Sequence, residues 1–364
     1  MSVTRTIIRR IRLTIVTVAC VTAAACNPAP AAPSGAAPRI PAGGVLSITP
    51  TTANIPAANG QEVLDAIQAT YDAGARGFYA AFRWNELEPS AGQYQLAGLQ
   101  AVMQAVSGTG FTRIFVSIHV INTNRKEVPT DLMAVAWDAP QMQLRFRALL
   151  DQVAPLLVAN VAYFAIGNEV DAYLGPASEW GAYGTFFSQA RTYLRGLKPG
   201  LPVGVATIFD GARGPWRTQV QSLNALADVA VYTYYGNSNG FLALQPSAGA
   251  QALTEMVTLA AGKPVLVQEF GQSSSSVNGG SEDLQARFFA TSLAAWSTLG
   301  SGAIPFFSVF ALHDFPPALC DDLLTYYGTG PNTAFREYLC YLGLRRQDRT
   351  AKPAWDSVRA FGRR

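Results

Sequence analysis

The sequence predicts a single (β/α)8 barrel, because short apolar runs alternate with amphipathic segments from residue 45 to the end of the chain. The apolar runs have the length and composition of buried parallel strands. Several helical segments end at a glycine just before the next run, as at Gly74, Gly110, Gly262 and Gly300, which fits the preference for glycine after a helix. Eight strand–helix units over roughly 320 residues match this fold.

The elements can be assigned in order. Strands are predicted over residues 45–48, 77–82, 113–120, 161–166, 202–208, 229–234, 264–267 and 303–310. Helices are predicted over residues 61–73, 96–106, 141–157, 185–197, 219–227, 251–261 and 283–299, with a last helix over either 332–342 or 352–361. A doubly wound sheet would carry a glycine-rich phosphate loop after its first strand, and residues 47–52 contain no glycine.

Composition excludes several classes of protein. Hydrophobic residues make up 49% of the 364 residues and charged residues 14%, which excludes a disordered or coiled-coil chain. Arg5, Arg9, Arg10 and Arg12 are four of the 27 basic residues, so the rest of the chain carries 23 basic and 24 acidic side chains. A chain whose remaining charges are this nearly balanced is not expected to form a basic surface that binds nucleic acid. With two histidines and no Cys or His cluster, we expect no metal and no cofactor.

The amino terminus resembles an export signal. Residues 1–26 place arginines before an apolar stretch, 13–25, that is too short and too rich in Thr and Ala for a membrane span. Alanines at 23–25 before Cys26 resemble a bacterial lipoprotein cleavage box, although the usual Leu is Ala23. Two outcomes stay open: lipidation of Cys26 with anchoring to the cell envelope, or cleavage to a secreted protein. Residues 27–44 form a Pro/Ala-rich linker before the catalytic barrel, 45–364.

Two cysteines lie in the barrel itself, Cys320 and Cys340. An exported protein reaches a compartment in which they can form a disulfide, and the alternative is a pair of free buried thiols.

Two predicted strands deliver a glutamate to the same end of the barrel. The run 162–166 leads into Gly-Asn168-Glu169, and the run 264–267 leads into Gln268-Glu269. The carboxyl ends of barrel strands build the active site. Two carboxyl groups there suit the cleavage of a glycosidic bond, in which one holds a proton for the leaving oxygen and the other stays ionised. A lone glutamate at a strand end is more often a salt-bridge or capping residue, and its repetition favours catalysis.

Other polar and aromatic side chains are expected at the barrel mouth. Tryptophans in the predicted mouth loops would offer flat surfaces for sugar rings, whereas His119 could equally be an interior residue and Arg83 a partner of a carboxylate. The full set of expected substrate contacts is Arg83, Trp84, His119, Trp137, Asn168, Trp180, Trp216, Tyr232 and Tyr234.

Three segments resemble the clan A retaining glycoside hydrolases, a (β/α)8 group that includes families 5, 39 and 42. They are Asn168-Glu169, Val-Gln-Glu269-Phe-Gly, and the segment 84–94, which is similar to the Trp…Glu-Pro…Gly-x-Tyr pattern of families 39 and 42. The resemblance implies that Glu169 is the acid/base, that Glu269 is the nucleophile and that Asn168 contacts the sugar 2-hydroxyl. It also implies that Tyr234 hydrogen-bonds the nucleophile and that His119 matches a histidine of family 5.

Two positions depart from the clan pattern. Arg83 is adjacent to Trp84 instead of several residues before it, and residues 307–310 at the end of strand eight contain no tryptophan. We expect a monomeric, retaining hydrolase of β-glycosidic bonds, and long aromatic loops favour endo action on a polysaccharide. The alternative is a catalytically silent, envelope-anchored carbohydrate-binding protein, which the missing tryptophan favours. An aldolase is disfavoured because no lysine lies in a predicted strand.

Overall fold

Parallel strands form a central ring in the structure, a computed structural model that describes residues 37–364. Going round the ring in sequence order, the strands are β1 (Val45–Ile48), β2 (Gly77–Arg83), β3 (Arg113–Asn122), β5 (Val161–Asn168), the short pair β6 (Val203–Gly204) and β7 (Ala206–Ile208), β8 (Ala230–Tyr235), β9 (Val265–Gly271) and β10 (Phe306–Val309). A further short strand, β4 (Arg125–Lys126), turns back antiparallel to β3.

The ring closes at two joints between two sheets, ordered β1-β10-β9-β8-β7 and β2-β3-β5-β6. At one joint, a single residue separates β6 from β7, so β6 pairs with β5 while β7 pairs with β8. At the other, the backbone N–H of Arg76 donates to the carbonyl of Leu46 at 3.0 Å, which ties the start of β2 to β1. The prediction of a (β/α)8 barrel is confirmed for the described residues.

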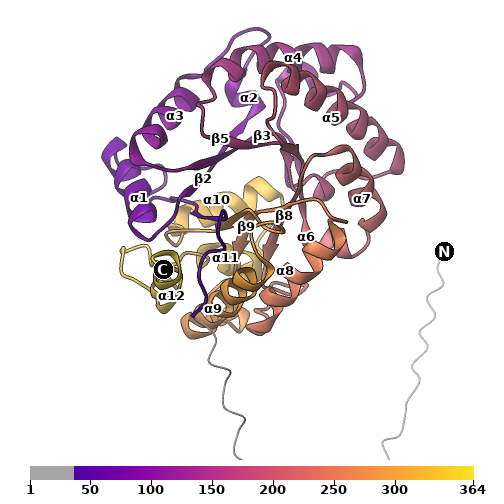
Figure 1. Cartoon of the computed structure of the whole chain (residues 1–364). Coiled ribbons are helices and arrows are strands. Elements are labelled where there is room, and N and C mark those ends of the chain that lie inside the picture. Colours follow the sequence, from indigo (N-terminus) through magenta and orange to yellow (C-terminus); the bar gives the residue numbers. More distant parts are fainter. Residues whose placement is uncertain (1–36) are drawn as a thin grey trace, which may run out of the picture. The chain divides into compact units, whose positions relative to one another are not determined.

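Helices surround the ring on its outer side (Figure 1). Their apolar faces pack on the strands, while caps such as Asn59 and Ser281 accept the first free backbone N–H groups of α1 and α9. These helices are α1 (Gly60–Asp72), α3 (Ala97–Thr109), α4 (Pro140–Val153), α5 (Ala177–Leu197), α7 (Arg217–Leu226), α8 (Ser247–Leu259), α9 (Glu282–Leu299) and α12 (Pro353–Gly362). Helix α5 begins well before the predicted residue 185, and the two alternatives for the last helix both form, as α11 (Thr333–Cys340) and α12.

Side chains fill the interior of the barrel towards the amino-terminal ends of the strands. Residues near the start of each strand meet inside the barrel, among them Val45, Tyr79, Phe115, Leu266 and Phe306. A second apolar layer lies between the strands and the helices. Because the floor is packed, the space for a ligand is at the carboxyl ends of the strands.

One excursion after β10 forms a cap over part of the mouth. It consists of α10 (Pro317–Tyr327) and α11 (Thr333–Cys340), and we call residues 317–340 the cap. Cys320 and Cys340 form a disulfide with their Cα atoms 5.8 Å apart, so the predicted pairing is confirmed. The bond joins the start of α10 to the end of α11 and keeps the excursion compact.

The predicted export signal, residues 1–26, and Cys26 lie outside the described residues, as does most of the linker 27–44. Within residues 37–364, no helix combines the length and the apolar character that crossing a membrane requires.

Candidate active site

Glu169 and Glu269 lie at the carboxyl ends of β5 and β9. Glu169 directly follows β5 with a backbone φ of 50°, and Glu269 lies within β9; both side chains are half-buried. In β9 the pairing with β8 passes from Val267 to Glu269, so Gln268 is the extra residue of a β-bulge. Bulges re-aim side chains beside active sites. Here the bulge directs both Gln268 and Glu269 towards the interior, where each has a hydrogen-bond partner.

Side-chain contacts bring the two glutamate segments together. The amide of Gln268 donates to Asn168 Oδ1 at 2.6 Å. Thr233, which pairs with Glu269 in the strand register, donates to Glu169 Oε1 at 2.7 Å. Two residues on separate halves of the ring therefore share one polar site, as the sequence predicts.

The two carboxyl groups bind protons more strongly than exposed glutamates do. Burial raises the pKa of Glu169, against the effect of the hydroxyl groups that donate to it. Burial and the charge of Glu169 raise the pKa of Glu269 to about 7, although the phenol of Tyr235 donates to Glu269 Oε2 at 2.5 Å and opposes the shift. Because two close carboxylates resist ionising together, the site retains a proton near neutral pH.

Tyr235 holds Glu269, so the prediction of this role for Tyr234 is wrong. Tyr232 and Tyr234 are both buried, so the prediction that they contact substrate is wrong as well. Side chains alternate along β8, and Thr233 and Tyr235 face the mouth. Tyr234 is buried against the helices with its hydroxyl 3.5 Å from the carbonyl of Ala248, and Tyr232 accepts from Asn224 at 3.0 Å in the same outer layer. The run Tyr-Thr-Tyr-Tyr does not show which tyrosine faces the mouth, because alternate residues lie on opposite sides of a strand and each side has a tyrosine here.

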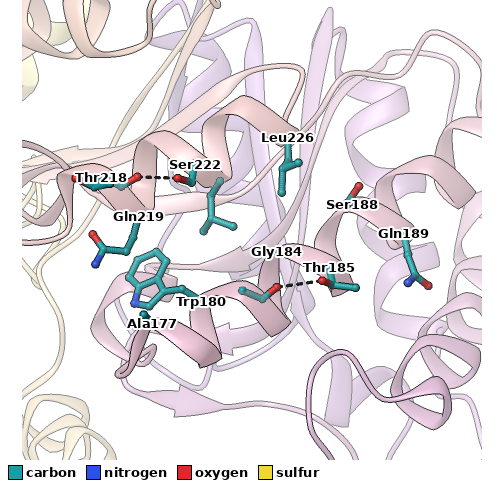
Figure 2. Close-up of a pocket in the computed structure, with 12 residues that line it drawn as sticks. Ala177, Trp180, Gly184, Thr185, Ser188, Gln189, Thr218, Gln219, Ser222 and Leu226 are labelled. Carbon is teal, nitrogen blue, oxygen red and sulfur yellow. Dashed lines mark hydrogen bonds between the residues drawn. The ribbon is translucent and has the colours of Figure 1, made fainter.

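Three of the four expected aromatic platforms lie away from the glutamates. Trp84 is buried and donates to Glu88 Oε2 at 2.8 Å, and Trp137 packs in the core against Tyr183. Trp180 lies on α5 against Trp216, where it lines a groove of about 680 Å³ between α5 and α7 (Figure 2). That groove, on the outside of the barrel, is not lined by either glutamate. The prediction that Trp84 and Trp137 contact sugar is therefore wrong, and Trp180 lines the outer groove instead. For Trp216, which is half-buried against Trp180, contact with sugar stays a prediction.

His119 of β3 lies beside Arg83, the last residue of β2. The ring nitrogen Nε2 of His119 lies 3.2 Å from the hydroxyl of Tyr79. Burial, and to a lesser extent the charge of Arg83, lowers the pKa of His119 to about 3, so its imidazole is neutral. Arg83 bridges to Glu86 at 3.1 Å, and its guanidinium lies 5.2 Å from the centre of the Tyr326 ring. Arg83 is thus a rim residue in contact with the cap.

The cap supplies tyrosines that sequence reasoning missed. The charges of Glu169 and Glu269 raise the pKa values of Tyr327 and Tyr338, in addition to the larger effect of burial, which identifies both phenols as neighbours of the carboxyl groups. The ring of Tyr338 lies 5.6 Å from that of Tyr235. One signal could have identified these tyrosines: they lie between the two cysteines of the disulfide.

Hydrogen bonds join the cap, which follows β10, to residues at and just after the end of β3. Tyr326 donates to Glu127 Oε1 at 2.6 Å and accepts from Asn122 at 2.8 Å, and the amide of Asn124 donates to the carbonyl of Tyr327 at 2.8 Å. Asn122 in turn accepts from Asn168 at 2.9 Å. The cap is therefore linked, through one side chain, to the residue before Glu169.

Among the described residues, no group of three or more His, Cys, Asp or Glu side chains is arranged to hold a metal ion. The chemistry available at this site is that of two carboxyl groups surrounded by hydroxyl and amide groups.

No family model and no curated protein matches the sequence. Solved structures match the fold. A GH5_18 enzyme of Streptomyces cattleya, crystallised with Manβ1-4GlcNAc, has a TM-score of 0.69 at 18% identity over 88% of this chain and 80% of its own. The exo-β-1,4-mannosidase Op5Man5 of an Opitutaceae bacterium has a TM-score of 0.68 at 19% identity over 89% of this chain and 60% of its own. β-Glucosidase 1317 has a TM-score of 0.62 at 16% identity over 83% of this chain and 87% of its own. The chain therefore shares the fold of these solved glycosidase structures.

Proposed function

We propose that this protein is a retaining β-glycoside hydrolase. One observation carries the proposal: Glu169 and Glu269 lie at the ends of β5 and β9 and share Thr233 as a neighbour, and burial raises the pKa of both carboxyl groups. A pair of carboxyl groups that together retain one proton is what acid–base and nucleophilic catalysis at a glycosidic bond require.

In the first step, ionised Glu269 attacks the anomeric carbon while protonated Glu169 gives its proton to the leaving oxygen. The glycosidic bond breaks, and a glycosyl ester forms on Glu269. In the second step, Glu169 takes a proton from water, which attacks the same carbon and releases Glu269 as a carboxylate. Asn168 would hydrogen-bond the sugar 2-hydroxyl, and Gln268 and Asn122 hold its amide in place.

We further propose that the substrate is the end of a β-linked chain. The cap covers the mouth between β10 and β3, and the tryptophans that favoured an open polymer cleft lie in the core or on the outer helices. Two of the structural matches also point this way, since one is named an exo-β-1,4-mannosidase and another was crystallised with Manβ1-4GlcNAc. β-Mannosides and β-glucosides are therefore the first substrates to test.

Trapping with a 2-deoxy-2-fluoro glycoside tests the reaction. An enzyme of this mechanism gains one glycosyl adduct, which peptide mapping locates on Glu269, and nuclear magnetic resonance shows that the first product keeps the β configuration. The rival is a silent carbohydrate-binding protein, favoured because Phe310 stands beside Tyr235 where the clan usually offers a tryptophan. Binding of β-glycans without any adduct on a competent substrate would support that rival and refute the enzyme.

We also propose that the protein acts outside the cytoplasm, since a disulfide clamps its cap and disulfides persist in oxidising compartments. Fractionation of cells that express the wild type and Cys26→Ser tests this and separates a lipid anchor from free secretion. Recovery of both proteins in the cytoplasm would contradict it.

A further inference from the structure

The carboxyl group of Glu169 is held by two threonine hydroxyls, one on each oxygen. Thr233 on β8 donates to Oε1 at 2.7 Å, and Thr123, just after β3, donates to Oε2 at 2.7 Å. Within the described part of the chain, neither oxygen is bonded to a lysine or an arginine. Because the donors come from different strands and grip both oxygens, they fix the direction in which the carboxyl group points.

Thr123 adopts a backbone conformation that its side chain disfavours. Its φ is 53°, in the left-handed region that β-branched residues rarely adopt. Its backbone N–H donates to the carbonyl of Asn168 at 3.0 Å, so Thr123 holds both the chain before Glu169 and the carboxyl group itself. Strained residues of this kind persist where the surrounding structure enforces them, and they cluster at functional sites.

The type of donor matters as much as its position. A hydroxyl donates to an ionised carboxylate and accepts from a protonated one, whereas a guanidinium only donates. Glu88 illustrates the second case, since its Oε1 accepts from Arg145 Nε at 3.0 Å. A double displacement needs one carboxyl group to lose a proton and then regain it, so Glu169 requires partners that serve both forms.

The titratable groups that face Glu169 come from every element around it. They are Tyr79 on β2, Asp171 just after β5, Tyr235 on β8, Glu269 on β9, Tyr327 on α10 and Tyr338 on α11. Of these groups, Tyr235 donates its phenol to Glu269, and the hydroxyl groups that donate to Glu169 are those of Thr123 and Thr233.

We propose that Thr123 and Thr233 are positioning residues that keep the Glu169 carboxyl group aimed at the leaving oxygen in both of its protonation states. The inference rests on the proposed function, because only a reaction of that kind uses both states of Glu169. It predicts that loss of either hydroxyl weakens acid catalysis and favours the protonated form.

Kinetics of Thr233→Val test the role in catalysis. With an alkyl β-glycoside, whose leaving group needs a proton, kcat/KM should fall on the order of tenfold, and the basic limb of its pH profile should move up by about one pH unit. With a dinitrophenyl glycoside, which departs without a proton, kcat/KM should change by no more than about twofold. Thr233→Ser, which keeps the hydroxyl, should recover the wild-type profile.

Thr207→Val is the matched control. Thr207 lies on the neighbouring strand β7, and its buried hydroxyl has no partner among the described residues, so its loss should leave both substrates and both limbs unchanged. Equal losses on the two substrates, or a Thr233→Val profile identical to that of Thr207→Val, would overturn the proposal. Thr123→Gly, which removes the second hydroxyl and also relieves the strained backbone, should repeat the Thr233→Val result.

A titration that does not depend on turnover separates this inference from the proposed function. Carbon-13 labelling of the glutamate side chains allows the pKa of Glu169 to be followed by nuclear magnetic resonance, with Glu169→Gln to assign the signal. A rise in that pKa in Thr233→Val but not in Thr207→Val supports the threonine role even if no glycoside is cleaved. An unchanged pKa refutes the threonine role even if the wild type is an active enzyme.

Discussion

Two groups of buried acids lie at the carboxyl ends of the strands, and they have different partners. Asp314, which follows β10, faces Lys352, with the ammonium nitrogen 2.7 Å from Oδ1 and both side chains buried. Burial raises the pKa of Asp314 to about 6, and the lysine works against that rise. Glu169 and Glu269 accept from Thr123, Thr233 and Tyr235 instead, all of which are hydroxyl donors.

Under the proposed mechanism, the difference separates a structural acid from two reacting ones. A buried cation holds its carboxylate in the ionised form, and removing it leaves an uncompensated charge. Hydroxyl donors place a smaller restriction on the carboxyl group, so a proton can arrive and leave during each turnover. Asp314 thus has a cation as its partner, whereas Glu169 and Glu269 have hydroxyl groups.

The largest effect is expected from the catalytic group. Glu269→Gln removes the nucleophile while keeping its size, so kcat on an aryl β-glycoside should fall by about 10⁴-fold or more. Glu255→Gln, on the exposed side of α8 next to Arg213, is the control and should retain full activity. Near-normal turnover by Glu269→Gln would break the comparison, because Glu269 would then not be a reacting group.

The structural pair should respond in stability instead. Lys352→Met leaves Asp314 buried without its cation, which should lower the free energy of unfolding by about 3–5 kcal/mol. The loss should be smaller at pH 5 than at pH 8, because Asp314 can take up a proton. Denaturant unfolding at the two pH values measures it, with Lys198→Met, whose ammonium donates to the carbonyl of Leu157, as control. An equal loss of unfolding free energy in Lys198→Met would show that the Asp314–Lys352 pair has no particular effect on stability.

The catalytic carboxyl groups should reduce stability at high pH. Glu269 has a pKa of about 7 in the folded protein against 4.5 ordinarily, so the folded state binds more protons than the unfolded state between these values. Its favourable contribution is complete below pH 4.5 and is lost as the pH rises through 7. Glu269→Gln should therefore unfold like the wild type at pH 4 and be about 1–3 kcal/mol more stable at pH 8. A variant less stable than the wild type at pH 8 would contradict this.

The smallest effect is expected from Tyr235, the tyrosine that contacts Glu269 in place of the predicted Tyr234. Tyr235→Phe removes the donor to Glu269, which should raise the pKa of Glu269, move the acidic limb of kcat/KM to higher pH, and lower kcat/KM at pH 6 about tenfold. Tyr234→Phe is the matched control, since its phenol faces the helices, and it should leave the profile in place. The reverse pattern would restore the original prediction for Tyr234.

Periodicity was sufficient to predict the order of strands and helices, because buried parallel strands and amphipathic helices have different apolar patterns. The glutamate pair was predictable as well, since the end of a strand has a fixed place in a barrel. The side of the sheet on which a side chain lies was harder to predict, because Tyr234 and Tyr235 are adjacent in sequence and point in opposite directions. Trp137 and Trp180 were misassigned because an aromatic side chain near the mouth can equally pack inward against the core.

Contacts between distant segments were beyond a local argument. The hydrogen bonds of Tyr326 to Asn122 and Glu127 join residues about two hundred positions apart, and their local sequence gives no indication of the partner. The same holds for Thr123 and Thr233 at Glu169, which converge only when the ring closes.

The disulfide after β10 makes the cap a self-contained insert. The disulfide between Cys320 and Cys340 joins its two ends, so the residues between them can be exchanged without any change in the strands that carry the glutamates. The tyrosines that overhang the reacting groups belong to this insert, while the carboxyl groups belong to the ring. Substrate preference could thus diverge through a stretch of some twenty residues while the catalytic pair stays untouched.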